Sequence, residues 1–193
     1  MHPLNGHPLT DPHLRRLVDD TAHALGGVAQ LADSLTDVQL AWSPAPGSWS
    51  VAQCLDHVAI VTGHFADQLG PVVGHARRHP TPPRPYRPRW WARRILARAV
   101  PDSAARYVTA ASWRPAERPL PGAPARATAA LQRIAALAIA ADGVDINHVM
   151  VAAPASRLLR LSVGDALTAA VGHARRHVSQ ARRVRDHPAF PSD

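Results

Sequence analysis

The chain contains very little cysteine and no lysine. Cys54 is its single cysteine, which excludes an intramolecular disulfide and any metal site built from several thiolates. All 22 basic residues are arginines, and alanine and proline are abundant too, a bias that a GC-rich coding sequence produces without a functional cause. Composition therefore assigns no function by itself.

Long apolar runs are also missing. No segment is apolar over the length of a membrane span, and no basic stretch followed by an apolar one opens the chain. We therefore expect a cytoplasmic protein without a membrane span. The 193 residues suit one domain, covering 1–193, with a sizeable core. A phosphate-binding loop, a dinucleotide fingerprint and a Gly-x-Ser-x-Gly elbow are all absent from the sequence.

The net charge of +8 and the isoelectric point near 11.4 raise the question of an anionic partner. Arginines are spread over the whole length apart from one cluster at 84–98, which also contains aromatic residues. This spread favours solvated basic faces over a dedicated surface for a nucleic acid or an anionic membrane. Nucleic-acid binding through 84–98 stays open as the less favoured interpretation.

The strongest helical pattern is the last one, over 162–184. Ser162 and Asp165 resemble a capping box, and an apolar stripe of helical period follows. His173 and His177 are four residues apart beside this stripe, so one helix face presents both imidazoles, as two metal ligands on one helix require.

Spacing alone is weak evidence for a metal site in a chain with 12 histidines, because about one such pair is expected by chance. His75 and His79 have the same spacing but run into Pro80 and a proline-rich tract, where a helix is expected to end. The pair at 173 and 177 lies within a helix. Without a third ligand, these two residues could equally be polar-edge histidines of a basic helix.

Three further helices are expected, at about 11–40, 50–69 and 125–141. The second begins at a capping box of Ser50 with Gln53, and the preceding Trp49 can pack on Cys54. The proline-rich insertion of about 71–124 separates the second helix from the third, and 144–161 is expected to be a crossover connection. The pattern predicts an all-α chain, a four-helix bundle with an insertion between its second and third helices.

Within the insertion, 90–100 fits a short basic amphipathic helix. Such a helix suits an anionic membrane surface or a nucleic acid, but basic and aromatic residues also occur as a plain cover over a core. We favour the cover.

Two segments, P-G-S-W-S-V-A-Q-C-L-D-H-V at 46–58 and L-S-V-G-D-A-L-T-A-A-V-G-H-A-R-R-H-V-S-Q at 161–180, together with the order of the helices, resemble the DinB/YfiT-like superfamily. Its members carry a Trp-Ser-x-x-Gln/Glu start on the second helix, a histidine about seven residues later, and a closing His-x-x-x-His helix. The resemblance covers the first, second and fourth helices well, the third loosely and 71–124 hardly at all.

The resemblance implies that His57, His173 and His177 are metal ligands. Three neutral imidazoles suit Zn²⁺, Ni²⁺ or Fe²⁺ and leave a coordination position open, as in catalytic sites. Possible partners for the ligand N–H groups are His64, His148, Asp56 and Asp165.

Characterised relatives resemble low-molecular-weight thiol transferases or thiol-dependent isomerases, so the resemblance implies a metal-dependent enzyme acting on a small thiol and a small electrophile. Arg175, Arg176 or the arginines at 84–98 are candidates to hold an anionic substrate group. Cys54 lies three residues before His57, but a lone cysteine at an apolar helical position usually packs. The alternative is a stress-associated bundle without catalysis that acts through its surface or as a homodimer.

Overall fold

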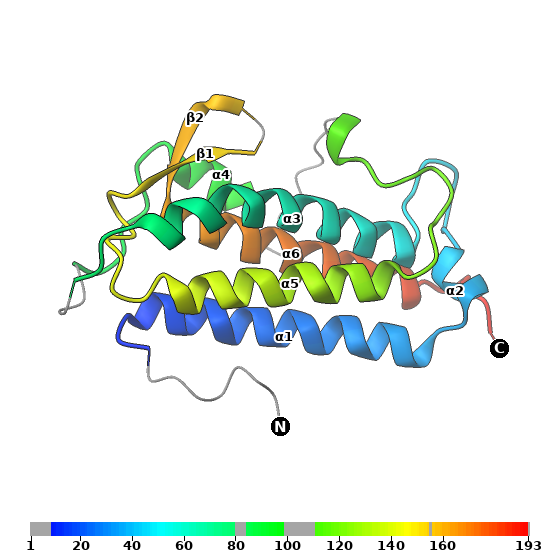
Figure 1. Cartoon of the computed structure of the whole chain (residues 1–193). Helices are drawn as coiled ribbons and strands as arrows, with labels where there is room; N and C mark the ends of the chain where they lie inside the picture. Colours follow the sequence, from blue (N-terminus) through cyan, green and yellow to red (C-terminus); the bar gives the residue numbers. More distant parts are fainter. Residues whose placement is uncertain (1–8, 80–83, 99–110, 155, 193) are drawn as a thin grey trace.

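A computed structural model describes residues 9–79, 84–98, 111–154 and 156–192 of the chain. It is mostly helical, with four long helices and a small two-stranded antiparallel sheet (Figure 1). The elements are α1 (Pro12–Ser34), α2 (Asp37–Ala41), α3 (Val51–His75), α4 (Ala92–Arg98), the 3₁₀ turn η1 (Ala111–Trp113), α5 (Ala123–Ala140), β1 (Met150–Ala153), β2 (Ser156–Ser162) and α6 (Val163–Arg185).

The four long helices lie side by side, and α5 and α6 each pack against both α1 and α3 (Figure 1). Two clusters of buried apolar residues run between them. One includes Leu14 and Leu167 and also takes in the hairpin and α4, and the other includes Leu31 and Leu55. Truncating such a buried leucine to alanine costs about 2–5 kcal/mol. The packing of α3 on α6 is the contact that matters for the site below.

The last helix begins where the sequence predicted. Ser162 is its N-cap, and its hydroxyl accepts a hydrogen bond from the Asp165 amide at 3.1 Å. The helix ends at Arg185, one residue beyond the expected end. The third long helix, α5, is likewise within two residues of its expected bounds.

The first expected helix is interrupted. α1 ends at Ser34, and Thr36 forms a complete capping box with Gln39, which starts the separate short helix α2. A threonine followed three residues later by glutamine is a helix start. The predicted single helix over 11–40 was therefore wrong at this point.

The second expected helix is longer than predicted. α3 continues through Gly70 and Pro71 to His75. A proline inside a helix removes one backbone hydrogen bond, but Leu69 and Val73 on either side are fully buried, and their burial offsets that loss. The connection to α5 accordingly starts at residue 76, five residues later than the expected insertion.

The expectation of an all-α chain needs one correction. The predicted crossover at 144–161 contains β1 and all but the last residue of β2, which form a hairpin in which Val151 pairs with Leu161. Both of these side chains are buried against the first core cluster. Alternate burial along β1 explains why this stretch forms a strand.

The connection from α3 to α5 carries the basic helix that the sequence predicted at 90–100, observed as α4; positions 99 and 100 lie outside the described residues. Ala92 is fully buried, and Trp91 and Leu96 pack against the first core cluster, so α4 covers the core. Trp90 points outward and is 81% exposed. Among the described helices, none is long and apolar enough to cross a membrane.

Candidate metal centre

Two helices bring three histidines together. His57 lies on the second turn of α3, whose start is fixed by the capping box of Ser50 and Gln53. His173 and His177 lie one turn apart on α6, which packs against α3. The ring centroids are 4.9 Å apart for His57 and His173 and 4.5 Å apart for the other two pairs. One potential ligand atom from each ring lies within 4.8 Å of the others, an arrangement that could hold a metal ion.

The Nε2 atoms of His57 and His173 are 3.2 Å apart. Ligand nitrogens about 2.0–2.1 Å from a tetrahedral ion are about 3.3 Å from one another. The Nδ1 atom of His57 lies 2.6 Å from the backbone carbonyl oxygen of Trp113. A carbonyl can only accept, so Nδ1 carries the proton and the Nε2 lone pair of a neutral His57 points toward His173.

His177 is oriented in the same way. Its Nδ1 lies 2.9 Å from Oε1 of Gln180, which accepts the Nδ1 proton and leaves Nε2 free to act as a ligand. A contact of this kind behind each ligand is usual in metal sites, where it fixes the tautomer and the ring orientation.

His173 differs from the other two histidines. Its Nδ1 is buried and has no hydrogen-bond partner among the described residues. If Nε2 donated to His57, Nδ1 would be a buried acceptor without a donor. If Nδ1 carried the proton, two Nε2 lone pairs would face each other. A cation next to the Nε2 atoms removes the second conflict, so the donor set fits a divalent ion on that side.

Burial keeps the three imidazoles neutral. It lowers the pKa of His57 against the opposing effect of the Trp113 carbonyl, and it lowers the pKa of His173 well below 6.5, helped by the nearby His177 and His57. Burial, followed by the field of His57, lowers the pKa of His177 to about 3. Neutral rings offer the lone pairs that a metal needs.

Trp49 forms one wall of the cluster. Its ring centroid is 4.8 Å from that of His57 and 5.8 Å from that of His177. The sequence suggested a contact of Trp49 with Cys54. Cys54 belongs to the second core cluster, and Trp49 packs against that cluster. The contact with the two histidines was not predicted.

Cys54 does not take part in the site. Its side chain is fully buried, and burial raises the pKa of its thiol to about 12. It stays a protonated core residue, as expected for a lone cysteine at an apolar helical position.

Three of the four residues suggested as partners of the candidate ligand histidines have other contacts. Asp56 forms an ion pair with Arg126 at 2.8 Å. Asp165 accepts a hydrogen bond from Tyr86, and His148 contacts Asp145. His64 is exposed, with no hydrogen bond recorded for its ring among the described residues. The observed partners are the Trp113 carbonyl, which no side-chain motif could reveal, and Gln180, whose position three residues after His177 was a usable signal.

The candidate anion-binding arginines differ in their position relative to the three histidines. Arg175 forms an ion pair with Asp20 of α1 at 2.8 Å, so it points to that helix. The positive charge of Arg176 contributes to the lowered pKa of both His173 and His177, which places its field at the site. Among the arginines of 84–98, Arg89 donates to the sulfur of Met150 at 4.0 Å.

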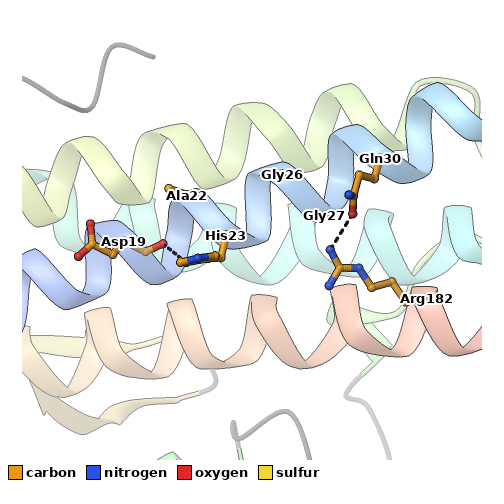
Figure 2. Close-up of a pocket in the computed structure, with 7 residues that line it drawn as sticks. All are labelled: Asp19, Ala22, His23, Gly26, Gly27, Gln30 and Arg182. Atoms are coloured by element: carbon orange, nitrogen blue, oxygen red, sulfur yellow. Dashed lines mark hydrogen bonds between the residues drawn. The ribbon is translucent and has the colours of Figure 1, made fainter. Parts of the chain in front are cut away.

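A separate groove of about 550 Å³ lies between α1 and α6 (Figure 2). Its lining comprises Asp19, Ala22, His23, Gly26, Gly27, Gln30 and Arg182. Arg182 donates to Gln30 across the groove, and the His23 ring bonds a backbone carbonyl. None of the candidate site residues lines this groove.

Comparison with known families bears on the same residues. A family model described as the DinB superfamily matches residues 22–181, which includes α3, most of α6 and all three histidines. The chain belongs to the DinB superfamily. No curated protein and no solved structure matches it. In this DinB protein the histidines expected from the resemblance come together in space, and the connection 76–122 adds a backbone contact to one of them.

Proposed function

We propose that this DinB protein is a metal-dependent enzyme that transfers a low-molecular-weight thiol to a small electrophile. Its metal ligands are His57, His173 and His177, and its metal is Zn²⁺, Ni²⁺ or Fe²⁺. The scaffold is a single four-helix bundle domain of α1, α3, α5 and α6.

The observation that carries the proposal is the convergence of three neutral imidazoles, two of which have their outer Nδ1 atom held by an acceptor. Structural zinc sites usually have four protein ligands, whereas three leave room for a substrate atom. An all-nitrogen donor set suits the three metals named.

The chemistry that a bound divalent ion supplies is positive charge, which lowers the pKa of a coordinated thiol. In the reaction the thiol proton passes to solvent, the sulfur forms a bond to the electrophilic carbon, and the leaving group departs with its bonding electrons. The chain's own residues orient the substrate and shield the site from water. Trp49 excludes water from one side of the cluster, and the Arg176 charge favours an anionic group on the substrate.

The first test is the metal content of untagged protein by elemental analysis, with a His173→Ala/His177→Ala variant beside the wild type. We expect close to one equivalent of metal in the wild type and almost none in the variant. A wild type that folds normally and never retains metal would overturn the metal site.

The second test separates catalysis from binding alone. Metal-loaded protein is supplied with each of several small thiols and an aryl halide, and loss of the thiol is followed with metal-free protein as the control. Conjugation above background only in the loaded protein supports the transferase. Background rates with every thiol would favour a non-catalytic metal-binding bundle that acts through its surface or as a homodimer.

A further inference from the structure

The segment 111–117, which begins with η1, is held against α3 by side chains of that helix. The Trp113 carbonyl accepts from Nδ1 of His57 at 2.6 Å. The carbonyls of Ala116 and Glu117 both accept from the side-chain amide of Gln53, each at 3.0 Å. Figure 1 shows this green stretch passing above α3 before the chain reaches the start of α5.

His57 and Gln53 lie four residues apart on α3, so they are neighbours on one face of the helix. Two α3 residues therefore donate all three of these hydrogen bonds. The acceptors belong to the backbone, so the contact does not depend on which side chains the segment carries. Gln53 has a second role at the same time, because its Oε1 accepts from the Ser50 amide in the capping box at 3.0 Å.

The Trp113 bond decides which nitrogen of His57 can bind a cation. A neutral imidazole exists as two tautomers, and only the one with its proton on Nδ1 has a lone pair on the Nε2 that faces His173. Removing the Trp113 carbonyl from this position would free the ring to rotate and to exchange tautomers. Loss of such a contact behind a metal ligand lowers metal affinity by about 10–100-fold.

We propose that 111–117 is a positioning segment for the metal centre, with the Trp113 carbonyl fixing His57 and Gln53 holding the segment in place. The proposal rests on the metal site of the proposed function and adds a coupling between metal binding and the ordering of 111–117. Coupling between two events is reciprocal. If the segment strengthens metal binding, metal binding must order the segment by the same factor.

Gln53→Glu tests the coupling because it changes one of the two roles of this residue. Glutamate is the standard capping-box partner of serine, so the start of α3 is preserved. The amide donors are lost, and a carboxylate faces the carbonyls of Ala116 and Glu117. The new negative charge lies one turn from His57 and favours cation binding, so a fall in affinity would occur against this electrostatic effect.

Gln39→Glu is the matched control. Gln39 holds the same capping-box position in α2, and its side-chain amide donates to the Pro191 carbonyl at 3.1 Å. The exchange adds the same charge and removes the same kind of donor at a cap that does not hold 111–117.

The measurements are Zn²⁺ affinity, by competition with a chromophoric chelator, and hydrogen exchange of peptides covering 111–117 with and without Zn²⁺. We expect Gln53→Glu to bind Zn²⁺ about 10–100-fold more weakly and Gln39→Glu to bind it as the wild type does. We also expect exchange in 111–117 to slow when Zn²⁺ is added to the wild type, a readout that does not depend on how any variant folds.

Different failures can be told apart. Two results would overturn the coupling and leave the metal site intact. One is that Gln53→Glu binds Zn²⁺ as well as the wild type does, and the other is that Zn²⁺ binds to the wild type without changing hydrogen exchange in 111–117. A wild type that binds no metal overturns the proposed function and the coupling with it.

Discussion

Oε1 of Gln180 lies 2.9 Å from Nδ1 of His177, one helical turn further along α6. Gln180→Leu removes the acceptor that holds the proton on Nδ1, so we expect metal affinity to fall by about 10–100-fold. Gln180→Glu keeps an acceptor in place and should bind at least as tightly as the wild type. Competition with a chelator measures both variants, and Ser179→Ala on the same helix serves as control. Equal affinities for the leucine and glutamate variants would contradict this role of Gln180.

The lowered pKa values of the three histidines make the stability of the metal-free protein depend on pH. The rings are neutral when folded and titrate near 6.5 when unfolded, so the unfolded chain binds more protons and stability falls as the pH drops below about 6.5. For His177, with its pKa of about 3, the loss between pH 7 and pH 5 is about 1–2 kcal/mol. Urea unfolding at both pH values tests this.

The control for the pH prediction replaces all three histidines by glutamine, which does not titrate. His13, whose pKa burial lowers to about 4, titrates in the same range and is kept in both proteins. We expect the triple variant to lose less stability than the wild type over this range. An identical loss in the two proteins would show that other groups cause it.

The positions of the long helices followed from the sequence because caps and apolar stripes are local signals. Ser50 and Ser162 both start helices in the structure. The same kind of signal is present at Thr36, but the apolar stripe continues past it and favours a single helix. The predicted helix over 50–69 stops short of the observed end at His75, because burial of Val73 beyond Pro71 depends on the tertiary fold, which a local pattern does not contain.

The side chains of the candidate site could be predicted from the sequence, but its backbone contact could not. The resemblance selected His57, His173 and His177, and the structure brings them within contact. The Trp113 carbonyl could not be predicted, because a backbone acceptor has no sequence signature and the connection that supplies it has weak periodicity. The hairpin was missed because its strands are short and surrounded by helical patterns.

Tyr86 joins the connection after α3 to the first turn of α6. Its hydroxyl donates to Oδ1 of the fully buried Asp165 at 2.8 Å, while Oδ2 of this carboxylate has no partner among the described residues. Tyr86→Phe would leave both oxygens without a donor side chain, at a cost of about 1–3 kcal/mol in unfolding free energy. Urea unfolding measures it, with Trp90→Phe, at an exposed position of the same connection, as the control for a substitution by phenylalanine. A Tyr86→Phe protein as stable as the wild type would mean that water satisfies Asp165.

Two adjacent glycines of α1 should respond oppositely to alanine. A Cβ at Gly26 meets nothing within 4 Å, so Gly26→Ala should stabilise the protein by about 0.5–1 kcal/mol through helix propensity. A Cβ at Gly27 would lie 2.7 Å from Cγ1 of Val178 on α6, too close for two carbon atoms. Arg182, also within reach, is flexible and can move aside, but Val178 is packed in the second core cluster. Gly27→Ala should therefore force α1 and α6 apart and cost about 1–3 kcal/mol, as overpacking of a core does. In thermal unfolding, the Tm values of the two variants shift in opposite directions if α1 and α6 are in contact at Gly27, and in the same direction if they are not.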